Sequence, residues 1–252
     1  MTGLTSVTFR QFSVDEIIHL TAKAELDGIE WGSDVHAPVG NLKIAQHVGE
    51  QTRAAGLQVL SYGSYYKLCQ TNDPVAEFKP VLRSAKALGA PNIRIWAGTC
   101  APDQADETYY CRAAQELKTL CRMAESITIS LEYHRGTLTE NAKSTMKLLE
   151  QANCENLRTY WQPNPDVTHE ENCLEVARVR PYVSNIHVFQ WHGNNIRYKL
   201  AEGCCDWQAF IRTANMDLSK ISYILEFVKD DSPEIFVEDA ATLKCWLKEC
   251  EA

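Results

Sequence analysis

The stretch ITISLE, residues 127–132, alternates apolar and polar side chains and ends in a glutamate. Successive side chains of a β-strand point to opposite faces, so the three apolar residues share one face and the three polar residues share the other. In a strand covered by helices, the apolar face packs against those helices. Glu132 is therefore the last of three inward-facing polar residues, and a carboxylate at this position is hard to explain as part of the hydrophobic core.

Short β-rich runs of this kind recur along the chain, and each is followed by helical spacing or a helix-start signal. Alternating strands and helices indicate a parallel sheet, and eight units favour closure. The length of 252 residues matches one such barrel, typically of ~250 residues. We expect one α/β domain over residues 1–252, a (β/α)8 TIM barrel, with strands at Leu4–Val7, Gly28–Trp31, Leu57–Tyr62, Asn92–Ala97, Ile127–Glu132, Leu157–Gln162, Val183–Val188 and Ile221–Val228.

Helix boundaries are signalled at several points between these strands. Ser13 with Glu16 three residues later predicts a capping box, and Thr137 with Glu140 is a second candidate before the fifth helix. Gly56 and Gly89 are placed where the second and third helices should end.

Charge and composition limit the partners of the protein. The net charge is −8, and no Lys/Arg stripe could follow a phosphate backbone, so no nucleic-acid partner is expected. No export signal or apolar run of ~20 residues is visible, which predicts a cytoplasmic protein without a membrane partner. The ten cysteines should remain thiols, because no CxxC spacing suggests zinc. No GxGxxG or GxxxxGK[ST] motif indicates a nucleotide.

Two further strands repeat the pattern of the first. In SYILEFV, residues 222–228, Glu226 has inward parity, and in NIHVF, residues 185–189, His187 does. Active sites of such barrels lie at the C-terminal strand ends. Two carboxylates and an imidazole would repel or desolvate one another there, and a divalent cation is the simple compensation. Oxygen-rich ligands with one imidazole favour Mn²⁺, Mg²⁺ or Co²⁺.

Five motifs are distributed along the chain: DGIEW followed by His36, LEYHRGTLTEN around Glu132, NIHVFQW around His187, the Gly203–Trp207 segment, and LEFV around Glu226. On these motifs the sequence resembles, over nearly its whole length, the sugar phosphate isomerase/epimerase branch of the xylose isomerase-like TIM barrels, which includes ketose 3-epimerases and inosose isomerases. The resemblance implies that two glutamates carry protons and that four residues hold the metal. Carried over, the metal ligands are Glu132, Gln162, His187 and Glu226, and the proton carriers are Glu132 and Glu226.

Gln162 departs from the family pattern, which usually has an aspartate there, and Pro165 stands where a histidine often follows. A neutral amide oxygen attracts a cation less than a carboxylate does, so weaker metal binding is expected.

The implied chemistry is proton abstraction next to the carbonyl of a small sugar or cyclitol, with return of the proton by the second glutamate. The sequence leaves open whether this gives epimerisation or aldose-ketose isomerisation, and whether the chain forms a homo-oligomer. The missing Gly-rich cradle favours an unphosphorylated substrate. Substrate contacts are expected from His36, Arg94, Trp96, His134, Trp161 and Arg197.

Each of these contacts has a structural alternative. Arg94 could pair inside the barrel with Glu30 or Glu132, the histidines could make local hydrogen bonds, Arg197 could be a solvated loop charge, and the tryptophans could be packing residues.

Two alternative functions are also open. An endonuclease IV-type phosphodiesterase is disfavoured, because the net charge is acidic where a DNA groove would be basic, and because the histidines at the barrel mouth are too few to bind three zinc ions. A degenerate barrel that binds a sugar or partner without turnover is favoured by Gln162.

Overall fold

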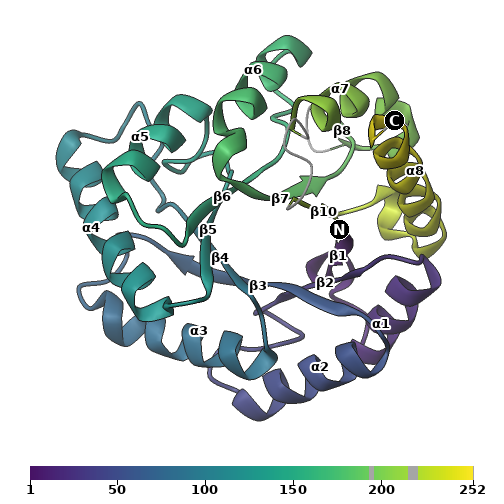
Figure 1. Ribbon diagram of the computed structural model, residues 1–252, viewed down its shortest axis with the longest axis horizontal. Coiled ribbons are helices and arrows are strands. Elements are labelled where there is room, and N and C mark those ends of the chain that lie inside the picture. The colour runs from purple at the N-terminus through teal and green to yellow at the C-terminus, as the bar shows by residue number, and fades with distance from the viewer. Residues whose placement is uncertain (193–195, 215–220, 252) are drawn as a thin grey trace.

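The computed structural model describes residues 1–192, 196–214 and 221–251. Eight parallel strands form a closed barrel in the order β1-β10-β7-β6-β5-β4-β3-β2. Figure 1 shows this ring of strands surrounded by helices. The strands are β1 (Thr2–Thr5), β2 (Gly28–Gly32), β3 (Gln58–Lys67), β4 (Asn92–Trp96), β5 (Thr128–Glu132), β6 (Leu157–Trp161), β7 (Val183–Val188) and β10 (Ser222–Leu225). The predicted TIM barrel is confirmed.

Helices alternate with the strands along the chain and pack around the outside of the barrel (Figure 1). They are α1 (Val14–Lys23), α2 (Leu42–Ala54), α3 (Pro74–Leu88), α4 (Glu107–Ala124), α5 (Ala142–Ala152), α6 (His169–Val179), α7 (Cys204–Ala214) and α8 (Pro233–Glu251). Within the described ranges, no helix is long and apolar enough to cross a membrane. All ten cysteines are free thiols.

The first and last barrel strands end earlier than the sequence predicts. β1 stops at Thr5, because Ser6–Phe9 form a 3-10 turn. The strand begins earlier than predicted, at Thr2, because Gly3 pairs with Gly28 of β2. This pairing needs a glycine, since a Cβ on Gly3 would lie 2.9 Å from the Gly28 carbonyl oxygen. β10 stops at Leu225, and Phe227 has a left-handed φ of 51°. Glu226 therefore follows the strand instead of lying within it.

The capping predictions are confirmed at one helix and wrong at another. Ser13 and Glu16 form the reciprocal capping box of α1. Gly89, with φ of 77°, is the C-cap of α3, and Gly56, with φ of 79°, follows the end of α2. Thr137 and Glu140 do not begin a helix. Asn141 caps α5, while Glu140 accepts a hydrogen bond from the Gly136 amide.

A short antiparallel hairpin was not expected from the sequence. It pairs β8 (Trp191–His192) with β9 (Ile196–Arg197) beyond the end of β7. The Tyr198 amide donates to the Gln190 carbonyl and closes this hairpin against the strand end. The hairpin therefore places Trp191 and Arg197 at the barrel mouth.

Polar side chains fill the barrel interior beneath the mouth. Asn92 Nδ2 donates to Tyr160 Oη and to Asn185 Oδ1, both at 3.2 Å, and Ser130 Oγ donates to Asn92 Oδ1 at 2.8 Å. Because each of these residues comes from a different strand, the hydrogen bonds connect the four consecutive strands β4, β5, β6 and β7. The residues above them rest on this layer.

Candidate active site

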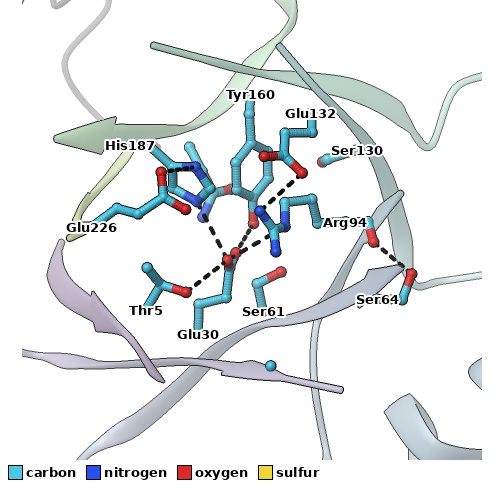
Figure 2. A network of polar contacts seen from close by, with 12 residues as sticks. Thr5, Glu30, Ser61, Ser64, Arg94, Ser130, Glu132, Tyr160, His187 and Glu226 are labelled. Atoms are coloured by element: carbon cyan, nitrogen blue, oxygen red, sulfur yellow. Dashed lines mark hydrogen bonds and ion pairs between the residues drawn. The ribbon is translucent and has the colours of Figure 1, made fainter. Parts of the chain in front are cut away.

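Three side chains converge at the C-terminal end of the barrel, from three of the four consecutive strands β5, β6, β7 and β10. Glu132 ends β5, His187 lies in β7, and Glu226 directly follows β10. One ligand atom from each lies within 4.8 Å of the others, and all three side chains are buried. Figure 2 shows them pointing toward one another inside the barrel. Their predicted inward direction is confirmed.

The two nitrogens of His187 face different groups. Nδ1 lies 3.2 Å from Gln162 Oε1 and 3.4 Å from Glu226 Oε2. Nε2 lies 3.3 Å from Glu30 Oε1 on the opposite side of the ring. The structure thus brings Gln162 to the same group as the three residues that sequence parity placed there.

Glu30 is the main residue of this group that the site prediction left out. It is completely buried on β2, where Thr5 Oγ1 donates to its Oε1 at 3.2 Å and Tyr160 Oη donates to its Oε2 at 2.6 Å. The signal was available in GIEWG, since Ile29 and Trp31 share the helix-facing parity and leave Glu30 inward.

Arg94 joins the two acids on either side of it. Its Nη1 lies 2.9 Å from Glu132 Oε2, and its Nε lies 3.4 Å from Glu30 Oε1 (Figure 2). Arg94 is only 3% exposed. These contacts are those of the interior ion pair that sequence analysis offered as the alternative to substrate binding.

Burial and charge shift the proton affinities of this group. Burial raises the pKa of Glu226, and the nearby Glu132 carboxylate adds to this effect against the opposing charge of His187. Burial would lower the pKa of His187, but the charges of Glu226 and Glu30 raise it overall. Burial would likewise raise the pKa of Glu30, yet Arg94 and His187 hold it at about 2. The site therefore contains one acid whose pKa is held low, Glu30, and one whose pKa is raised, Glu226.

The donor set fits a divalent cation. Glu132 Oε2 is buried and makes no hydrogen bond, only the ion pair with Arg94. Together with Glu226, His187 Nδ1 and the amide oxygen of Gln162, it supplies three oxygens and one imidazole, which suits Mn²⁺, Mg²⁺ or Co²⁺. Zinc accepts imidazole and carboxylate ligands as well.

A family model described as the xylose isomerase-like TIM barrel matches residues 18–250. The chain belongs to this family. No curated protein sequence matches the chain.

Among similar solved structures is the probable 3-DHS dehydratase AsbF, involved in petrobactin synthesis in Bacillus anthracis, with 15% identity and a TM-score of 0.82 over 97% of this chain and 99% of that one. The 3-keto-D-glucoside 4-epimerase YcjR of E. coli has 15% identity and a TM-score of 0.74 over 99% of both chains. The IolI protein, solved with a bound zinc atom, has 13% identity and a TM-score of 0.77 over 98% of both chains. At these identities the likeness concerns the fold.

A cavity of about 270 Å³ lies beside the group of Glu132, His187 and Glu226, at the barrel mouth. It shares Gln162 with the acid cluster, and its walls combine aromatic rings with polar groups. The lining residues are Tyr133, His134, Arg135, Glu140, Gln162, Pro163, Asn164, Pro165, Phe189 and Trp191. Such a mixed lining is typical of small-molecule sites.

Three of the predicted substrate contacts lie around the mouth. The Trp96 ring stacks on His134 with centroids 4.3 Å apart, and His134 lines the cavity. Arg197 lies over Phe227, 4.9 Å from the ring centroid, and forms an ion pair with Asp231. Their contact with substrate stays a prediction.

Two other predicted contacts lie outside the cavity lining. Both ring nitrogens of His36 have partners, Ser6 Oγ at 3.0 Å and the Phe12 carbonyl at 2.9 Å. Trp161 is fully buried on the helix-facing side of β6, where it packs against Phe210 of α7 with centroids 5.3 Å apart. Its parity is opposite to that of the inward Tyr160. For both residues, the contacts match the structural alternative.

Proposed function

We propose that this chain is a divalent-metal-dependent isomerase or epimerase of a small sugar or cyclitol. The observation that carries the proposal is the buried group of Glu132, His187 and Glu226, with ligand atoms within 4.8 Å at the strand ends where such barrels react. The similarity to YcjR, a 3-keto-D-glucoside 4-epimerase, supports the same class.

The two glutamates have different tasks in this proposal. Glu226, whose pKa is raised by burial, is suited to hold and donate a proton. Glu132, ion-paired with Arg94, is suited to accept one from the carbon next to a carbonyl. In the reverse direction their roles exchange. Glu132, Gln162, His187 and Glu226 would hold the cation, which would supply Lewis-acid polarisation of that carbonyl.

The cavity supports a sugar-like ligand. Phe189 and Trp191 are adjacent rings, 4.3 Å between centroids, on which the apolar side of a sugar can stack. Asn164, His134 and Arg135 offer hydrogen bonds to hydroxyl groups from the other walls.

The test is exchange of substrate hydrogen with solvent. Metal-free protein is loaded with Mn²⁺ and incubated in D₂O with a panel of ketoses and cyclitols, and NMR follows deuterium at the carbon next to the carbonyl. We expect exchange in the wild type and a fall of about 100- to 10,000-fold in Glu226→Gln. Unchanged exchange in this variant would contradict the acid/base assignment.

Glu116→Gln is the matched control. Glu116 is a buried glutamate of α4 that accepts from Tyr66 Oη at 2.8 Å and the Cys69 amide at 3.1 Å, away from the cluster. Its loss should leave exchange intact. A ligand that binds Mn²⁺-loaded wild type without any exchange would favour the alternative, a barrel that binds without turnover.

A further inference from the structure

The imidazole of His187 is divided between two sides of the barrel. Nδ1 faces Gln162 and Glu226, at 3.2 and 3.4 Å, and these residues belong to the proposed ligand set. Nε2 faces Glu30, at 3.3 Å, which lies on the other side of the ring (Figure 2). A neutral imidazole has one N–H and one lone pair, so the partner of one nitrogen determines what the other can do.

Glu30 is held firmly by groups from three other strands. Tyr160 Oη donates to Oε2 at 2.6 Å, Thr5 Oγ1 donates to Oε1 at 3.2 Å, and Arg94 Nε lies 3.4 Å from Oε1. With no exposed surface, the carboxylate has no water to exchange with these partners. Its position is therefore fixed before any ligand arrives.

The ring of His187 is held by the same network. Tyr160 meets the imidazole edge to face, with centroids 5.0 Å apart and an angle of 80° between the planes. Since Tyr160 also donates to Glu30, one side chain orients both the imidazole and the carboxylate that faces it.

We infer that Glu30 is a positioning residue that selects the metal-binding nitrogen of His187. Its carboxylate accepts the Nε2–H, which leaves the Nδ1 lone pair directed toward Glu226 and Gln162. A carboxylate on the second nitrogen of a histidine ligand orients the ring and strengthens its donation to a metal. The inference rests on the proposed function, because it states how that site holds its cation.

Arg94 makes the negative charge of Glu30 important as well. The guanidinium is shared between Glu30 and Glu132, with its Nη1 2.9 Å from Glu132. If Glu30 became neutral, Arg94 would pair with Glu132 alone and compete with the cation for that carboxylate. Neutralising Glu30 therefore weakens metal binding in two ways, through the imidazole and through Glu132.

The test is Glu30→Gln in the full chain, with Mn²⁺ binding measured by calorimetry. We expect Kd to rise about 10- to 100-fold. A second readout is nitrogen NMR of Zn²⁺-loaded protein with ¹⁵N-labelled histidine, assigned with His187→Ala. The wild type should show a metal-bound Nδ1 and a protonated Nε2. In the variant, the metal and the proton should no longer be confined to one nitrogen each.

Controls separate the possible failures. Tyr160→Phe keeps the ring and removes the hydroxyl that donates to Glu30 Oε2 and accepts from Asn92 Nδ2. Because the Glu30 carboxylate itself remains, the effect of this variant should be smaller. Glu116→Gln should bind Mn²⁺ as the wild type does. If Glu30→Gln does not fold, Glu30→Asp replaces it, and we expect this variant to bind Mn²⁺ with an affinity between those of the wild type and a full loss. The nitrogen spectrum of the wild type then tests which nitrogen of His187 binds the metal. Wild type that binds no metal would overturn the proposed function together with this inference. Wild-type binding with equal affinity in Glu30→Gln, or a metal-bound Nε2, would overturn this inference alone.

Discussion

Glu132 and Glu226 face the same imidazole, but their surroundings differ. Glu132 lies 2.9 Å from the guanidinium of Arg94, while the ion-pair partner of Glu226 among the described residues is the imidazole of His187, at 3.4 Å. Burial then raises the pKa of Glu226. Two identical side chains thus have different electrostatic surroundings, an arrangement that suits division of acid and base tasks.

Gln162 is the neutral member of the proposed ligand set, and replacing it by an acid tests whether additional negative charge strengthens metal binding. In Gln162→Asp, a carboxylate would replace the amide oxygen that lies 3.2 Å from His187 Nδ1. Its attraction for a divalent cation should exceed the added repulsion from Glu226, because the cation carries twice the charge. We expect Mn²⁺ to bind at least about tenfold more tightly in calorimetric titration, a gain of about 1.4 kcal/mol.

Gln162→Asn provides the control, since it shortens the side chain without adding charge. It should bind Mn²⁺ no more tightly than the wild type. Equal or weaker affinity in Gln162→Asp would show that this side chain does not reach the cation.

Strand parity alone predicted where Glu132, His187 and Glu226 point, because each lies in, or directly after, a strand whose apolar face is clear. The same rule applied to β6 separates Gln162 from Trp161, which packs outward on Phe210. The contact between Glu30 and His187 could not be predicted from local pattern, since it joins side chains 157 residues apart.

At the scale of elements, α8 is joined to the segment after the β8–β9 hairpin by a buried carboxylate. Asp239 is 4% exposed and accepts the Leu200 amide at 2.9 Å. Burial raises its pKa to about 6 from 3.8, an effect that the bond to Leu200 partly offsets. The folded protein therefore binds this proton more tightly than the unfolded chain does, so this group adds stability as pH falls from above 6 toward 4.

Asp239→Asn should remove this pH dependence and keep an oxygen acceptor for Leu200. We expect the variant to be more stable than the wild type by about 2 kcal/mol at pH 8, with the difference shrinking toward zero near pH 4. Urea unfolding of both proteins across this range measures it. Parallel stability curves for the two proteins would show that Asp239 does not titrate as its burial implies.

Element boundaries were harder to predict than elements. The left-handed φ of 51° at Phe227 ends β10 before the apolar run LEFV is complete. β1 begins at a polar Thr-Gly pair, whose pairing with β2 depends on close approach at Gly3. The β8–β9 hairpin has only two residues in each strand, too few for a period-two pattern.

At the scale of the whole molecule, closure of the barrel gathers charges that lie far apart in the chain. Glu30, Glu132 and Glu226 surround one guanidinium, that of Arg94, and one imidazole. When all three carboxylates are ionised and the imidazole is neutral, as metal ligands must be, two negative charges lack a counter-charge inside a buried site. A divalent cation supplies that charge, and this balance is the physical basis of the proposed metal centre.

The most direct measurement is the number of Mn²⁺ ions bound per chain by metal-free protein, with Glu132→Gln titrated in parallel. The account predicts one ion per wild-type chain and affinity at least about 100-fold weaker in the variant, because a carboxylate ligand is lost. Absence of stoichiometric binding to the wild type, or equal affinity in Glu132→Gln, would contradict it.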